Sequence, residues 1–205
     1  GTLETNQMAR QLQPGLIINN RSWLDEDFGT PEGHVTAQDR DWEACMTFNG
    51  ISWGYVPSDQ AAPDSYNVRG ILRMLWKACA GGGNLLLNIG PAPDGSVLAE
   101  AVEPLRNVGT WLDRNGEAVY GQAQRGDLRT CRWGDTTVRG NTVYLWTSIW
   151  PDGDAGLGGF MTPLKSARIL QDGTPLTFEQ HDQRIVLKDL PQPCPDEIAG
   201  RVVIE

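Results

Sequence analysis

Residues 81–95, GGGNLLLNIGPAPDG, place three glycines ahead of a continuous apolar run that ends in a proline-rich turn. A run of this length between glycine and proline is typical of a parallel strand buried on both faces. The stretch matches neither G-x-x-x-x-G-K-[ST] nor G-x-G-x-x-G, and its glycines precede the strand, whereas phosphate-binding loops follow one. It therefore predicts a structural strand rather than a nucleotide site. Asn88, near the strand end, is expected either to line a site or only to satisfy neighbouring backbone.

The regions on both sides of this strand alternate between helical and strand patterns. Apolar residues recur at spacings of three and four from Val68 to Cys79, which predicts an amphipathic helix with Gly81 at its C-cap. Such alternation is expected of βα units in a parallel α/β domain. The expected elements are a helix over 3–12, a strand over 16–18, a long loop over 22–41, a strand over 42–48, a helix over 65–80, the strand over 84–90 and a helix over 98–112.

The pattern changes after Gly121 to short β-rich runs separated by Gly, Asp and Pro turns. These runs predict an antiparallel sheet or a small β-sandwich. We place the boundary near residues 121–127 and divide the chain into an α/β domain, 1–122, and an all-β domain, 123–205. The expected strands of the second domain are 142–149, 166–170, 184–187 and 202–204.

Composition narrows the choice of partners. The formal net charge is −9, from 26 acidic and 17 basic residues, so the overall field repels nucleic acid and anionic membrane surfaces. No apolar run approaches the roughly 20 residues of a membrane helix. The cysteines are widely scattered without a C-x-x-C pair, which does not favour a structural zinc site. They are Cys45, Cys79, Cys131 and Cys194.

Carboxylates and aromatic residues gather in and after the loop over 22–41. Glycoside hydrolysis needs one acid to protonate the glycosidic oxygen and a second carboxylate to attack the anomeric carbon, and flat aromatic rings suit sugar binding. Most of these acids are expected to be solvated surface, and core packing is the alternative for each aromatic residue. A nucleophilic hydrolase is not favoured, since His34 and His181 fall in different domains. The residues in question are Asp25, Glu26, Asp27, Glu32, Asp39, Asp41, Glu43, Trp23, Trp42, Trp53 and Tyr55.

Five segments of the first 121 residues form an ordered set of motifs. They are LQPGLIINNR (12–21), DFGTPE (27–32), WEACMTFNGISWGY (42–55), GGGNLLLNIGPAPDG (81–95) and VGTWLDRNGEAVYG (108–121). In order and spacing the set resembles the C-terminal half of the α-L-fucosidases of glycoside hydrolase family 29. The β-rich remainder is similar to that family's C-terminal β-sandwich.

The resemblance implies a fold and an activity. The fold is the C-terminal part of a (β/α)8-like (TIM) barrel followed by an antiparallel β-sandwich. The activity is retaining exo-hydrolysis of terminal α-L-fucose from glycans through a covalent fucosyl-enzyme, with no metal or organic cofactor. The family's nucleophilic Asp is expected upstream of Gly1, outside this chain. The resemblance also implies that the protein is secreted, periplasmic or lysosomal.

The resemblance also assigns roles to individual residues. Arg21 matches the arginine that binds the sugar near the nucleophile, Glu32 the general acid/base, and Trp53 the aromatic residue near the C6 methyl group of fucose. Glu43 is a rival for the acid/base, but a carboxylate that begins a strand is less free to approach a leaving group. His34 is either an exposed loop residue or a contact to substrate.

Two functions remain open at this point. The first is an α-L-fucosidase, of which this chain is the whole or a piece. The second is a non-catalytic carbohydrate-binding remnant that lacks the nucleophile. A half-barrel exposes parallel strand edges and half a core, so it is expected to be inactive or unstable alone. The expected partners are a fucosylated oligosaccharide and, to cover the exposed edges, the missing N-terminal half or a homo-oligomer.

Overall fold

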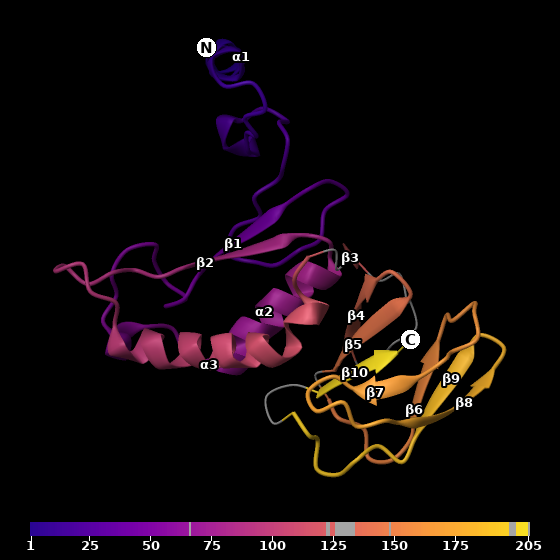
Figure 1. The fold of residues 1–205 in the computed structure, drawn as a ribbon. Coiled ribbons are helices and arrows are strands. Elements are labelled where there is room, and N and C mark those ends of the chain that lie inside the picture. The colour runs from indigo at the N-terminus through magenta and orange to yellow at the C-terminus, as the bar shows by residue number, and fades with distance from the viewer. Residues whose placement is uncertain (66, 122–123, 126–133, 148, 197–199, 205) are drawn as a thin grey trace.

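The computed structural model describes residues 1–65, 67–121, 124–125, 134–147, 149–196 and 200–204. Its first part alternates helices and strands and its second part is a β-structure, as Figure 1 shows. The elements are α1 (Thr2–Leu12), η1 (Asn20–Ser22), β1 (Glu43–Thr47), η2 (Ser58–Gln60), α2 (Val68–Ala80), β2 (Asn84–Asn88), α3 (Ala99–Asn115), η3 (Gly116–Ala118), β3 (Gln124–Arg125), β4 (Gly134–Arg139), β5 (Thr142–Thr147), β6 (Ala155–Gly158), β7 (Ala167–Ile169), β8 (Thr177–His181), β9 (Arg184–Lys188) and β10 (Gly200–Ile204).

The three expected helices and two of the expected strands in the α/β part are present. β1 and β2 pair in parallel, with Cys45 opposite Leu86 and Thr47 opposite Asn88. α2 starts at Val68 because the side chain of Asn67 caps it by accepting hydrogen bonds from the amides of Arg69 and Gly70. The helix ends at its C-cap Gly81, as expected from the sequence.

The expected strand over 16–18 is wrong. These residues form no strand, and the side chain of Ile17 is 71% exposed. A strand exists only where a neighbour supplies a ladder of hydrogen bonds, and residues 16–18 have few partners among the described residues. Ile18 accepts a hydrogen bond from the amide of Asp27 and donates its own amide hydrogen to the Asp27 carboxylate.

The expectation that residues 84–90 are buried on both faces is also wrong. Within the described part of the chain β2 pairs only with β1, and its side chains alternate between partly buried and exposed. Leu85 and Leu87 share one face and pack against buried clusters, whereas Leu86 lies on the other face and is 42% exposed. The apolar run therefore predicted the strand correctly, but only one of its faces is covered.

The glycines ahead of β2 act through packing rather than through a ligand. Trp42 is 2% exposed, and its ring lies over Gly81 and Gly83, where an added Cβ would come within 2.8 and 2.2 Å of ring carbons. Side chains at these two positions would displace the indole.

The second part of the chain consists of two antiparallel sheets. The five-stranded sheet has the order β3-β4-β5-β10-β7, and the three-stranded sheet has the order β6-β9-β8. Leu145, Ile169, Ile185 and Leu187 pack together in the core of this part, each no more than 1% exposed. The β-rich prediction is confirmed, and the structure adds β3, β4, β6 and β8, which were not expected. The proposed division at residue 122 stays a prediction, since residues 122–123 lie outside the described residues.

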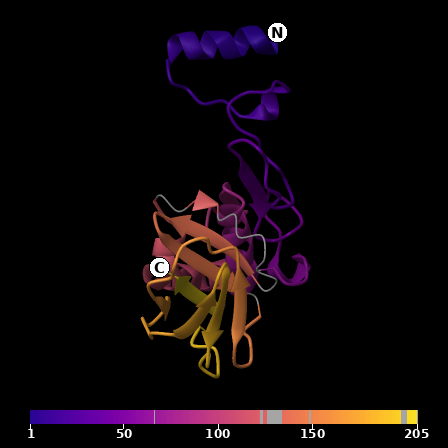
Figure 2. The same cartoon turned by 90° about the vertical axis from the view of Figure 1, so that its right-hand side faces the viewer.

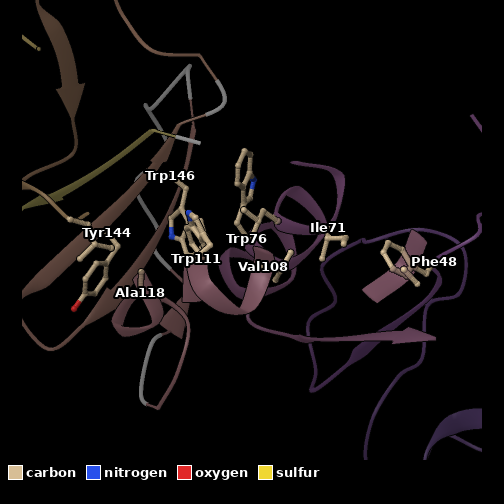
Figure 3. Packing of buried hydrophobic residues seen from close by; sticks show 11 residues of the cluster. Phe48, Ile71, Trp76, Val108, Trp111, Ala118, Tyr144 and Trp146 are labelled. Atoms are coloured by element: carbon tan, nitrogen blue, oxygen red, sulfur yellow. The ribbon is translucent and has the colours of Figure 1, made fainter. Parts of the chain in front are cut away.

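A second buried cluster joins the helices to the β-structure. Trp146 of β5 packs against Trp76 of α2 and Trp111 of α3, with ring centroids 6.2 and 5.9 Å away (Figure 3). We call these three residues the tryptophan junction. Each indole N–H has a partner: Trp76 donates to Asp135, Trp111 to Asp196 and Trp146 to the hydroxyl of Thr137. The junction therefore fixes α2 and α3 against the five-stranded sheet.

The N-terminal segment stands apart from this body. α1 lies at one end of the molecule, away from the other helices and from both sheets of the β-structure, in both views (Figures 1 and 2). It is tied to the following loop by Arg10, which pairs with Glu26 and Asp27, and by Asn6, which donates to Glu26. These contacts hold the loop that contains Arg21 against α1.

Candidate active site

Three of the residues assigned from the sequence meet in space. The Arg21 guanidinium forms an ion pair with the Glu32 carboxylate, with 2.5 Å between Nη1 and Oε2. The Trp53 indole donates to the other carboxylate oxygen, Oε1, over 2.8 Å. Both oxygens of Glu32 are thus engaged by side chains from separate loops.

Arg21 is oriented by its own neighbours. It lies in η1, where Asn19 caps the turn by accepting a hydrogen bond from the Arg21 amide. Its Nε donates to the hydroxyl of Thr30 over 2.7 Å, and that hydroxyl donates to the Asn20 side chain over 2.8 Å. The guanidinium therefore has one edge held by Thr30 and the other directed to Glu32.

Glu32 is placed by a segment that runs beside β1. Cys45 donates its amide to the carbonyl of Pro31 and accepts from the amide of Gly33, which makes Glu32 and Cys45 parallel partners. Two backbone hydrogen bonds therefore hold the segment around Glu32 against β1, although the side chain of Glu32 is 40% exposed.

Electrostatics favour the ionised form of Glu32. The Arg21 guanidinium, and then the Trp53 indole, hold the pKa of Glu32 below its ordinary value. The same pair raises the pKa of Arg21. In this structure Glu32 is consequently a carboxylate at neutral pH.

The remaining candidates lie less centrally. Glu43 occupies the first position of β1, at the opposite end of that strand from the loop that carries Trp53, and the described residues give it no side-chain ion pair. His34 is exposed, without a side-chain hydrogen bond to any described residue. Trp42 is core, whereas Trp23 is 96% and Tyr55 is 42% exposed.

Two residues that shape the site do not stand out in the sequence, and a third, Asn88, has one of the two roles expected of it there. Thr30 holds Arg21, and Asn49 organises the loop that carries Trp53. Asn88, for which two roles were left open, donates to the carbonyl of Trp53. A signal was present for Asn49 and Asn88, since both are polar residues directly after or at the end of an apolar strand pattern.

A large cavity among the described residues lies elsewhere. It has a volume of about 1000 Å³ and opens between α2, α3 and the segment around Asp196, and neither Arg21, Glu32 nor Trp53 lines it. The candidate site of Arg21, Glu32 and Trp53 is instead formed by exposed side chains on the surface. Among the described residues no group of three or more His, Cys, Asp or Glu side chains has the geometry to hold a metal ion. None of the described helices has the length and apolar character needed to cross a bilayer.

Comparison with known proteins identifies the family. The family model for α-L-fucosidases matches residues 2–117, which is more than half of the chain and contains Arg21, Glu32 and Trp53. The chain belongs to the α-L-fucosidase family. Human plasma α-L-fucosidase is 30% identical over 194 residues, a match that covers 87% of this chain and 41% of the human enzyme. Human tissue α-L-fucosidase is 37% identical over 118 residues, covering 56% of this chain and 25% of that enzyme.

A solved fucosidase structure has the same fold. Isoenzyme 1 of α-L-fucosidase from Paenibacillus thiaminolyticus superposes with a TM-score of 0.86 at 25% identity, over 99% of this chain and 53% of that chain. The chain thus spans about half the length of this fucosidase, and has the fold of part of a barrel followed by a β-domain. The fold class predicted from the sequence is confirmed.

Proposed function

We propose that this chain is the acid/base-bearing part of a retaining α-L-fucosidase that removes terminal α-L-fucose from glycans. The observation that carries the proposal is the convergence of Arg21, Glu32 and Trp53 within the range that the family model matches. A carboxylate held between a cation and an indole, beside an exposed aromatic ring, suits a proton donor that works on a sugar.

The proposed chemistry needs a second carboxylate. A nucleophile oxygen bonds to the anomeric carbon as the bond from that carbon to the departing oxygen breaks, and Glu32 donates its proton to the departing oxygen. A water molecule then gives a proton back to Glu32, and the oxygen of that water bonds to the anomeric carbon. The bond between the anomeric carbon and the nucleophile breaks at the same time, which frees fucose and restores the nucleophile. In retaining enzymes the two carboxyl groups lie about 5 to 5.5 Å apart. Within the described residues the ion pair of Arg21 involves Glu32 alone, so we assign the nucleophile to a segment outside this chain.

This assignment explains why Glu32 is ionised here although a proton donor begins its cycle protonated. Arg21 now pairs with Glu32 and lowers its pKa. A nucleophile carboxylate beside Arg21 would share the guanidinium and repel a negative Glu32, and both effects raise a carboxyl pKa. A nucleophile carboxylate in this position is thus expected to raise the pKa of Glu32 into the range of a general acid.

The uncovered face of the β1-β2 sheet supports the same proposal. Leu86 is 42% exposed in the middle of β2, whereas parallel strands are normally covered on both faces. We assign this face to the remaining barrel segment, with a second copy of the chain as the other candidate.

The test is hydrolysis of a nitrophenyl α-L-fucoside by this chain joined to, or mixed with, a barrel segment that carries the nucleophile. Turnover is expected only in the presence of both. Glu32→Ala is expected to lower the rate about 10²- to 10⁴-fold on poor leaving groups, the usual contribution of acid/base catalysis, with partial rescue by azide. Glu43→Ala serves as the matched control and is expected to keep most activity. A Glu32→Ala variant as active as its parent would remove Glu32 from the mechanism.

The second candidate is carbohydrate binding without catalysis. The exposed ring of Trp53 beside charged groups favours it, because this arrangement is already present without a nucleophile. Calorimetric titration with L-fucose distinguishes the two. Binding that needs Trp53, together with no turnover in any completed enzyme, would support the second candidate over the first.

A further inference from the structure

A buried asparagine, Asn49, fixes the loop that carries Trp53. Asn49 is 2% exposed, and its side-chain oxygen accepts hydrogen bonds from the amides of Ile51 and Ser52 at 2.9 and 2.8 Å. Its side-chain nitrogen donates to the carbonyl of Gly54 at 3.2 Å. One side chain thus joins both sides of the turn around Trp53.

The last residue of β2, Asn88, holds the same loop through a hydrogen bond. Phe48 donates its amide to the carbonyl of Asn88, so the backbone of Asn88 continues the β1-β2 ladder. From this fixed position its side-chain nitrogen donates to the carbonyl of Trp53 at 2.9 Å. The loop is therefore attached to the sheet at the residue that contacts Glu32.

Gly90 allows this attachment by close approach. A Cβ at position 90 would lie 2.2 Å from the carbonyl oxygen of Gly54, a backbone atom that a rotamer change does not move. The absence of a side chain there lets the segment after β2 lie directly against the loop.

We propose that Asn49, Asn88 and Gly90 are positioning residues, which hold the Trp53 loop so that its indole N–H is directed at Oε1 of Glu32. Asn88 and Gly90 belong to the stretch of residues 81–95. Through Trp53 this stretch is connected to Glu32, the proposed acid/base. The enzymatic consequence rests on the proposed function, whereas the geometric claim does not.

The first test uses the 205-residue chain and needs no activity. The Trp53 indole signal in a ¹H–¹⁵N spectrum, followed against pH, reports the titration of Glu32. Asn88→Ala is expected to shift that signal and to move its titration midpoint upward, because a loosened indole stabilises the carboxylate less. Asn84→Ala is the matched control, since Asn84 is the exposed asparagine at the other end of β2. An unchanged Trp53 signal and midpoint in Asn88→Ala would overturn the inference.

A second variant separates positioning from folding. Asn88→Ser keeps a polar side chain too short to reach the carbonyl, and it is expected to reproduce the change at Trp53. The buried indole signals of Trp76, Trp111 and Trp146 report whether the fold persists. Loss of these signals in both variants would assign Asn88 a purely structural role and would also overturn the inference.

The second test uses the completed enzyme. Asn88→Ala is expected to lower kcat about tenfold, with a smaller change in KM, because a displaced catalytic group slows the chemical step more than it weakens binding. An effect on KM alone would contradict positioning of the acid/base. Failure of the parent enzyme to cleave any fucoside would remove the proposed function and leave the spectroscopic test intact.

Discussion

The tryptophan junction and the candidate active site use the same donor in opposite surroundings. At the junction the indoles of Trp76, Trp111 and Trp146 are at most 5% exposed and each N–H is paired with a side-chain oxygen. At the site Trp53 pairs its N–H with Glu32 while 43% of the residue stays exposed. An indole couples a large apolar surface to one polar atom, so burial of the ring decides what the hydrogen bond does. In the junction it completes a core, and in the site it orients a carboxylate while the ring remains free to meet a ligand.

Trp146→Ala tests the junction and carries the largest expected effect. The residue is 0% exposed between two other rings, and removal of a buried tryptophan costs about 3–5 kcal/mol of unfolding free energy. Urea unfolding measures the loss. Trp23→Ala is the control, because that residue is 96% exposed and its removal is expected to change stability by less than about 0.5 kcal/mol. Equal losses in the two variants would contradict the division between the regions.

Gly83→Ala tests how tightly the sheet that carries the site is packed. The new Cβ would lie 2.2 Å from a ring carbon of buried Trp42, and such overpacking costs about 1–3 kcal/mol. Gly109→Ala in α3 is the control, since a Cβ there meets nothing within 4 Å and is expected to stabilise the helix by about 0.5–1 kcal/mol. Thermal unfolding distinguishes the opposite signs, and a stabilised Gly83→Ala would refute the packing role.

Acid pH is expected to weaken the ionic contacts of the candidate site and of the loop before it. The pKa values of Glu26, Asp27 and Glu32 are lowered by their hydrogen bonds to Asn6, Ile18 and Arg21, so their ionised forms stabilise the fold. That contribution is complete above the ordinary carboxyl pKa, about 4, and is lost as the pH falls through the lowered values. The Trp53 indole signal should therefore move as the pH falls below about 4, while the Trp146 signal stays constant until the chain unfolds.

Arg21→Ala sharpens this comparison. Without the guanidinium the pKa of Glu32 should rise toward its ordinary value, and the Trp53 signal should titrate at a higher pH. Simultaneous movement of the Trp53 and Trp146 signals in the parent chain would show one cooperative acid transition instead of a local one.

Local patterns predicted the elements whose causes are local. The helices at 68–80 and 99–115 follow from apolar spacing, and β2 follows from its apolar run. The strand over 16–18 and the double burial of β2 were wrong because both depend on neighbouring strands, which no window of sequence contains. Strand pairing is a property of the whole fold rather than of the segment.

The site divides in the same way. Motif resemblance singled out Arg21, Glu32 and Trp53, and the structure brings these three side chains together. The role of Asn88 depends on a side chain that reaches Trp53 across 35 positions of sequence, and Thr30 meets Arg21 across 9 positions, whereas Asn49 bonds to residues 2 to 5 positions ahead of it. Asparagine and threonine are common in loops for local reasons, so residue type alone does not separate the two uses.

The half-covered β1-β2 sheet has a consequence for the behaviour of the chain in solution. An open strand edge with Leu86 exposed favours pairing between molecules, whereas a net charge of −9 on every molecule opposes their approach. Dissolved salt screens charge beyond about 8 Å at physiological ionic strength and leaves apolar contact intact. Dilute buffer is therefore expected to keep this chain dispersed, and concentrated salt is expected to promote its self-association through the exposed face of the β1-β2 sheet.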